Sequence, residues 1–213
     1  MSASETMLEA SWRRAWGDVG IGPADPALLQ RLIDAWREPQ RRYHTLQHLA
    51  ECIAAFAPVR DLAQAPGEVE LAVWFHDAIY DVRRHDNEAR SADWARNAMV
   101  AAGAHADAAE RVHRLVMATR HAAPASAPDA MLLVDVDLSI LGAPAERFAQ
   151  YEAQVRDEYA WVDEAAFRLR RREVLTGFLA RPTIYATDPF RTRLEAAARA
   201  NLERSIRQLE GRP

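Results

Sequence analysis

The chain has 213 residues, of which 49% are hydrophobic, and its formal net charge is -4. This length and hydrophobic content predict one compact domain with its own core. All 27 basic residues are arginines, which excludes Schiff-base chemistry on a lysine and a P-loop lysine. No basic stripe is present, so we expect no nucleic-acid partner.

The chain has a single cysteine, Cys52, so no internal disulfide can form. The N-terminus has no apolar segment typical of a secretory leader. No apolar run approaches the roughly 20 residues that a membrane span needs. We therefore expect a cytoplasmic protein that does not enter a membrane.

Apolar residues at helical spacing, punctuated by proline and glycine, predict helices along the whole chain. In chain order, these helices lie around Trp12 and Trp16, from Pro23 and Pro26 to before Pro39, from Thr45 to near Pro58, and over 69–80, 86–99, 106–121, 131–141, 144–159, 163–180 and 188–209. No hairpin signal such as Asn-Gly occurs. The sequence therefore predicts an all-α fold, a helical bundle in one domain.

The pair His76-Asp77 ends the most apolar segment of the chain, after Leu-Ala-Val-Trp-Phe. Polar groups in such a segment are costly unless they are paired or bind a metal. The pair therefore predicts either a metal site or a buried His–Asp hydrogen bond within the core.

Two further histidines, His44 and His48, are four residues apart on a predicted helix. Side chains at this spacing project from one face, and neutral imidazole is the most frequent metal ligand. The pair is typical of a chelating arrangement, and the alternative is two exposed histidines on a helix face.

Two aspartates, Asp135 and Asp137, alternate with aliphatic residues in a segment that otherwise reads as buried. A carboxylate in such a place needs a cation, a hydrogen-bonding cluster or a raised pKa. Because residues two apart on a helix point in different directions, at most one of them is expected to be a direct metal ligand.

A histidine, then a His-Asp pair, then a distant aspartate in an apolar segment resembles the HD superfamily of metal-dependent phosphohydrolases. The resemblance extends to a subgroup of uncharacterised bacterial proteins described as predicted metal-dependent HD hydrolases, and it covers about Trp12 to Leu209. The segments that carry it are RYHTLQHL (42–49), WFHDAIYD (74–81), DNEARSA (86–92), DVDLSILG (135–142), VRDEY (155–159) and ARANL (198–202). It implies a single HD-type helical domain over 1–213, in which the metal site is built from about 44–137 and the helices of about 144–209 complete the bundle.

The resemblance implies that His48, His76, Asp77 and Asp137 are the metal ligands, with Asp135 as the alternative to Asp137. Nitrogen and oxygen ligands suit a divalent ion such as Mn, Mg, Fe, Co, Ni or Zn, with open positions for water and a phosphate oxygen. The ion would then act as a Lewis acid and lower the pKa of the attacking water.

The chain departs from the pattern at Tyr80, where several HD phosphohydrolases have a glutamate that acts as acid or base. A phenol that titrates near ~10 is a poor base at neutral pH. Asp81, predicted one helical turn past Asp77, and Glu88 are therefore candidates for the general base, beside Tyr80 itself.

Other candidates surround this set. His44, His121 and Asp135 are expected either to hold the ligands or to bind a second ion. His121 also reads as a surface histidine at a helix end. Arginine suits phosphate, and the candidates nearest to the motifs are Arg41, Arg42 and Arg156.

Taken together, these residues predict a metal-dependent hydrolase of a small phosphate ester, with a nucleotide as the favoured class. Two alternatives remain open. Tyr80 favours a metal- or nucleotide-binding module without turnover, and the additional histidines leave room for a di-iron HD oxygenase.

Overall fold

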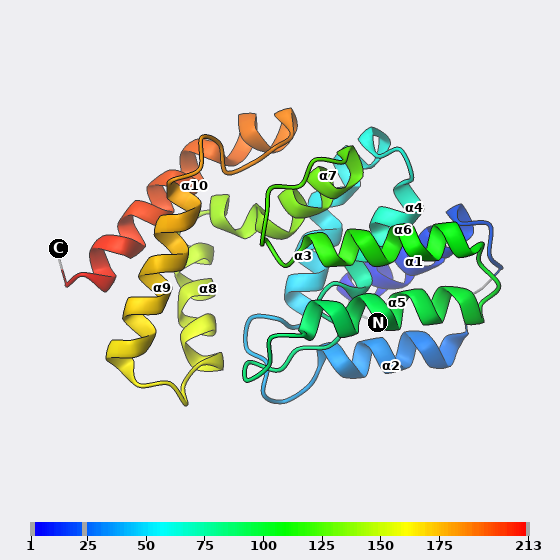
Figure 1. Cartoon of the computed structure of the whole chain (residues 1–213), viewed down its shortest axis with the longest axis horizontal. Coiled ribbons are helices and arrows are strands. Elements are labelled where there is room, and N and C mark those ends of the chain that lie inside the picture. The colour runs from blue at the N-terminus through cyan, green and yellow to red at the C-terminus, as the bar shows by residue number, and fades with distance from the viewer. Residues whose placement is uncertain (1–2, 23–24, 212–213) are drawn as a thin grey trace. The chain divides into compact units, whose positions relative to one another are not determined.

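The computed structural model describes residues 3–22 and 25–211, and every regular element in these ranges is helical (Figure 1). This confirms the predicted all-α fold. The α-helices are α1 (Ala3–Asp18), α2 (Pro26–Trp36), α3 (Leu46–Phe56), α4 (Pro66–Phe75), α5 (Asn87–Ala101), α6 (Ala106–Ala118), α7 (Pro128–Asp137), α8 (Ala145–Glu158), α9 (Glu164–Leu179) and α10 (Asp188–Leu209), and the 3-10 helices are η1 (Ala57–Leu62) and η2 (Leu138–Gly142).

The helices form two compact units, Met1–Asp137 and Leu138–Pro213. The N-terminal unit contains α1 to α7, and the C-terminal unit contains η2 and α8 to α10. That the helices of about 144–209 complete one domain with the residues of about 44–137 stays a prediction.

The core of the N-terminal unit is built around α4, where α1, α3, α5, α6 and α7 all pack against this helix. All residues from Gly67 to Phe75 are buried, on every side of the helix. A helix that is apolar all round must lie inside its neighbours, which explains the central place of α4.

The two glutamates of α4 are buried, and each pairs with an arginine whose side chain is exposed. Glu70 accepts a hydrogen bond from Ser11 Oγ at 2.6 Å and one from Arg14 Nε at 3.0 Å, which fastens α1 to α4. Glu68 is bound by both Nε and Nη2 of Arg111, at 2.8 and 2.6 Å, which fastens α6 to α4. These charges can be buried because each has a partner.

The helix predicted over 69–80 ends earlier, at Phe75, so that Tyr80 and Asp81 lie outside it. Side chains of α5 replace the helical acceptors beyond this point. The amide of Ile79 donates to Ser91 Oγ at 2.9 Å, and the amide of Asp81 donates to Asn87 Oδ1 at 3.1 Å. The prediction that Tyr80 and Asp81 lie one helical turn past His76 and Asp77 is therefore wrong.

Two other boundaries matter for the site. Thr45 caps α3, since its Oγ accepts from the amide of Gln47, so His44 lies before the helix and does not share a helical face with His48. The helix predicted to reach His121 ends at Ala118, and His121 has a left-handed φ of 52°.

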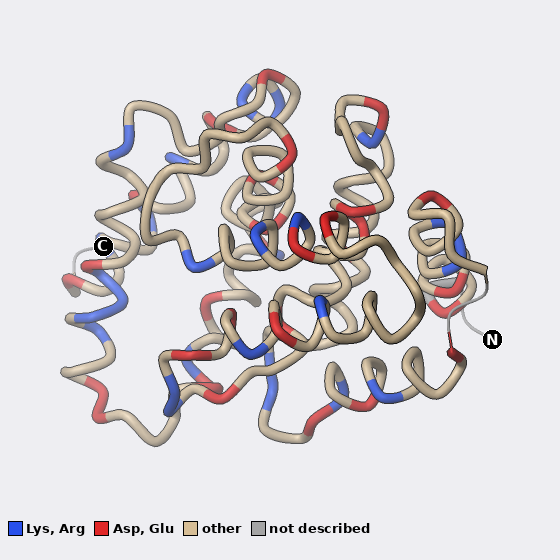
Figure 2. Tube along the Cα trace, turned by 45° about the vertical axis from the view of Figure 1, so that its right-hand side comes forward, with Lys and Arg blue, Asp and Glu red and all other residues tan. Residues whose placement is uncertain are grey.

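In the C-terminal unit, α10 packs against α9 and η2. Asn201 Nδ2 donates to the carbonyls of Leu141 and Ala143, both at 2.9 Å, which holds α10 on the end of η2. In the view of Figure 2, acidic and basic residues are interspersed over the helices. Of the described helices, none has the length and apolar character to cross a bilayer.

Candidate metal centre

Four of the predicted ligands converge inside the N-terminal unit, although they come from three segments. His48 lies in the first turn of α3, His76 and Asp77 directly follow α4, and Asp137 is the last residue of α7. Since α3 and α7 both pack against α4, the helix ends bring these side chains together.

The two imidazoles meet at their Nε2 atoms, which are 3.2 Å apart. The carboxylate of Asp77 places Oδ2 3.1 Å from His76 Nε2 and 3.7 Å from His48 Nε2. The carboxylate of Asp137 places Oδ1 3.3 Å from His48 Nε2 and 3.6 Å from His76 Nε2.

These distances fit the ligands of one metal ion. Two ligand atoms that each lie about 2.0–2.2 Å from an ion are roughly 3–3.6 Å apart at octahedral or tetrahedral angles. The nitrogen-nitrogen and nitrogen-oxygen separations lie at or close to this range. The donor set, two imidazoles and two carboxylates, suits a first-row divalent ion.

Cys52 was missed in the sequence, and its sulfur joins three of the four predicted ligands, without Asp77, in a group of close ligand atoms. His48, Cys52, His76 and Asp137 each offer a ligand atom within 4.8 Å of the others, and this group could hold a metal. Cys52 Sγ is 3.8 Å from His48 Nε2. Its spacing of four residues from His48 on α3 was the available signal, because such residues share a helical face.

His76 is oriented by the helix that precedes it. Its Nδ1 is 2.8 Å from the carbonyl oxygen of Val73, in the last turn of α4. An Nδ1–H that donates to this carbonyl leaves Nε2 directed at the cluster with its lone pair available to a metal.

The buried charges set the protonation of the metal-free site. Burial lowers the pKa of His48, and the neighbouring His76 adds to this shift. Burial also opposes protonation of His76, but Asp77 and Asp137 outweigh it and raise the pKa of His76 well above its usual range. In turn His76 holds the pKa of Asp77 well below its usual range, against the effect of burial.

Burial raises the pKa of the Cys52 thiol, and the nearby carboxylates of Asp137 and Asp77 raise it further. The thiol is therefore protonated in the metal-free site. Burial also acts to raise the pKa of Asp137, but its hydrogen bonds to His121, His48 and His76 hold it well below the usual range. The site thus combines a protonated His76 with two ionised carboxylates.

Arg41, a predicted phosphate ligand, instead holds the backbone beside the cluster. Its guanidinium donates to the carbonyls of His44 at 3.2 Å, Asp77 at 2.6 Å and Ala78 at 3.0 Å. Its Nε donates to Glu38 at 3.1 Å, and the side chain is fully buried. Arg41 therefore positions the turn that carries Asp77.

Two of the three candidate bases already have partners of their own. Tyr80 stacks on His44 with ring centroids 3.9 Å apart, and the guanidinium of Arg41 lies 5.5 Å from the Tyr80 ring centroid. Asp81 accepts from the amide of Arg83 at 2.9 Å and pairs with Arg84 at 3.6 Å. Glu88 lies in the first turn of α5 and is half-buried.

The remaining candidates are also placed by the structure. Asp135 is buried on α7, two residues before Asp137 and outside the group that could hold a metal. Arg42 is exposed and donates to the carbonyl of Pro39. Arg156 belongs to the C-terminal unit, where it binds Glu164 and the carbonyls that follow α8.

His121 lies against Asp137 from the side opposite the other histidines. Its Nε2 is 3.0 Å from Asp137 Oδ2, whereas Oδ1 of the same carboxylate lies beside His48 and His76. His121 adopts a left-handed φ of 52°, a conformation uncommon outside glycine and associated with functional sites. We interpret His121 as the residue that orients the Asp137 carboxylate.

Replacing His121 by alanine is expected to lower metal affinity about 10–100-fold, as for other groups that orient a ligand. His121→Asn should lose less, because asparagine tolerates the left-handed conformation and can donate a hydrogen bond to Asp137. Titration with a competing chelator measures both affinities. Equal affinities for wild type and His121→Ala would contradict the orienting role.

Comparison of the chain with protein-family models, with curated proteins and with solved structures finds no match.

Proposed function

We propose that the chain is a metal-dependent hydrolase of a small phosphate ester, of the HD type. The observation that carries the proposal is the convergence of His48, His76, Asp77 and Asp137 within the N-terminal unit. Their order in the sequence matches the order that the HD resemblance implies. A nucleotide is the first substrate class to test.

The site offers access as well as ligands. The side chains of Asp77 and Asp137 are each 16% exposed, whereas those of His48 and His76 are 2% exposed. The carboxylate side therefore faces solvent, and a substrate would approach from there. A divalent ion bound by these residues would supply Lewis acidity and lower the pKa of a water molecule.

The chain's own residues hold this arrangement before any substrate arrives. The carbonyl of Val73 directs Nε2 of His76 toward the site, and His121 directs the carboxylate of Asp137. The clamp formed by Arg41 fixes the turn at Asp77. Such preorganisation is what a hydrolase needs to hold a reactive geometry.

The test combines metal analysis with a panel of phosphate esters that includes nucleotides. Purified protein loaded separately with Mn, Fe, Co, Ni, Mg and Zn should hydrolyse at least one ester, and Asp77→Ala should reduce both bound metal and turnover. Asp86→Ala is the matched control, since Asp86 is an exposed aspartate outside the cluster. Turnover that survives Asp77→Ala would exclude this mechanism.

A second candidate is a metal-binding module without turnover. The observation that favours it is that two of the candidate bases are already engaged, Tyr80 by the ring of His44 and Asp81 by its own loop. Tight binding of a metal, with no product from any ester after long incubation, would select this candidate over the hydrolase.

Metal affinity should rise with pH. The raised pKa of His76 means that its imidazole carries a proton at neutral pH, and a metal must displace it. Below that pKa the apparent affinity should increase up to about tenfold per pH unit, and above it the dependence should flatten. Calorimetry in two buffers of different ionisation heat should detect proton release, and affinity independent of pH would contradict this prediction.

A further inference from the structure

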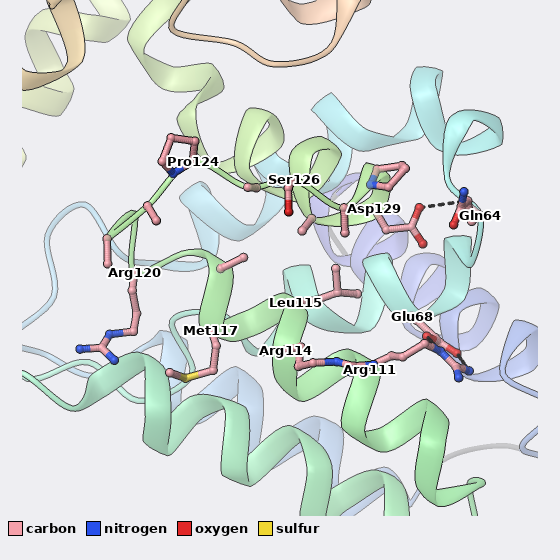
Figure 3. Close-up of a pocket in the computed structure, with 17 residues that line it drawn as sticks. Gln64, Glu68, Arg111, Arg114, Leu115, Met117, Arg120, Pro124, Ser126 and Asp129 are labelled. Atoms are coloured by element: carbon pink, nitrogen blue, oxygen red, sulfur yellow. Dashed lines mark hydrogen bonds and ion pairs between the residues drawn. The ribbon is translucent and has the colours of Figure 1, made fainter. Parts of the chain in front are cut away.

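A cavity of about 650 Å³ lies in the N-terminal unit between α6 and the segment that leads into α7 (Figure 3). Its volume is in the range of about 300–1,000 Å³ that is typical of small-molecule sites. Its described lining residues include none of the metal group, so a ligand here would be distinct from a substrate at the metal.

The walls of this cavity are mainly apolar. The helix α6 contributes Leu115, Met117 and Ala118, and the facing segment contributes small rigid residues (Figure 3). The apolar members of that segment are Ala122, Ala123, Pro124, Ala125, Ala127, Pro128 and Ala130. Such walls suit a compact apolar body such as a ring system or a short acyl chain.

The two acidic residues of the lining are already engaged. Glu68 is held by two hydrogen bonds from Arg111, at 2.8 and 2.6 Å. The two carboxylate oxygens of Asp129 accept the amides of Gln64 at 2.7 Å and Ala65 at 3.0 Å. Both carboxylates therefore already have hydrogen-bond partners within the protein and do not attract a cation into the cavity.

Two arginines of the lining remain available. Within residues 3–22 and 25–211, neither the Arg114 side chain nor the Arg120 side chain has a hydrogen-bond or ion-pair partner, and both are exposed. In Figure 3 Arg120 lies at one end of the cavity and the Glu68–Arg111 pair at the other, with Arg114 on the wall between them. The uncompensated charge of the lining is therefore positive.

We propose that this cavity binds a small organic anion. The guanidinium of Arg114 or of Arg120 pairs with its acid group, and its apolar body lies against Leu115, Met117 and the Ala/Pro segment. A guanidinium group suits carboxylate, phosphate and sulfonate groups. Burial of the apolar body against the walls adds binding free energy, because an exposed ion pair alone contributes little in water.

The test uses 8-anilinonaphthalene-1-sulfonate with the full chain, and N-phenyl-1-naphthylamine as its neutral counterpart. We expect one sulfonate probe to bind per chain. The double variant Arg114→Gln/Arg120→Gln should lower its affinity at least about tenfold, because it removes charge-assisted hydrogen bonds. The neutral probe should lose little. Octanoate and octyl phosphate should compete with the sulfonate, and the tighter competitor identifies the preferred acid.

The matched control is Arg90→Gln, since Arg90 is an exposed arginine on α5 outside the cavity. It should leave the affinity for the sulfonate unchanged. Circular dichroism and metal affinity verify the fold of the double variant, and Ala118→Trp, which fills the cavity, should abolish binding of both probes. Unchanged affinity in the double variant, an equal loss in Arg90→Gln, or failure of both competitors would overturn the proposal.

Discussion

Asp137→Asn is expected to lower metal affinity by at least about 100-fold, beyond the effect of losing a group that only orients a ligand. The Asp137 carboxylate approaches both histidine nitrogens, and asparagine keeps its shape but loses its charge. Hard divalent ions depend on anionic oxygen, so the amide is a much weaker ligand. Isothermal titration with Mn and Co measures the change.

The matched control for this variant is Asp135→Asn. Asp135 is buried on the same helix and was the alternative ligand, but it lies outside the group that could hold a metal. We expect the Asp135→Asn protein to bind metal with nearly the affinity of the wild type. A larger loss for Asp135→Asn than for Asp137→Asn would reverse the assignment of the last ligand.

Arg41→Met is expected to destabilise the protein by about 3 kcal/mol or more. The variant removes the donors to three carbonyls, those of His44, Asp77 and Ala78, and each buried acceptor without a partner costs about 1–3 kcal/mol. Arg41→Lys should recover only part of this loss, because an ammonium group does not reproduce the planar fork. Urea denaturation of the metal-free protein measures the free energy of unfolding.

The adjacent residue provides the control, since Arg42 is exposed and Arg41 is not. Arg42→Met should change stability by no more than about 0.5 kcal/mol, as surface substitutions usually do. If both variants lose the same stability, the carbonyl clamp is not the cause. Metal affinity of the folded Arg41→Lys protein should also fall, because the turn at Asp77 is then less well held.

Hydrophobic periodicity was sufficient to predict the class of the fold and most of its helices. The helix from Asp188 to Leu209 has the predicted bounds, and α3 begins directly after Thr45, close to its predicted start. The helix over 69–80 was predicted too long because its apolar pattern continues through Ala78 and Ile79. What ends it is a set of side chains from α5 and from the segment before α3, which local sequence does not reveal.

The same limit applies to the site. The apolar setting of His76-Asp77 by itself indicated polar groups that need a partner or a metal, whereas His48 and Asp137 were chosen over His44 and Asp135 only through the HD resemblance. Cys52 had a local signal in its spacing from His48, but the clamp at Arg41 depends on contacts with residues 36 and 37 positions away in the sequence. Arg41 was predicted to bind phosphate because it lies next to a motif, but its guanidinium donates to three backbone carbonyls.

The carbonyl clamp joins the residue just before α3 to the turn just after α4, so it links the segments that carry His48 and Asp77. These segments are fixed to each other by protein atoms alone. The ordering entropy of the site is thus lost when the chain folds and not when an ion enters. We therefore expect the chain to stay folded without a metal and to bind an ion reversibly, in contrast to small domains whose fold depends on the metal.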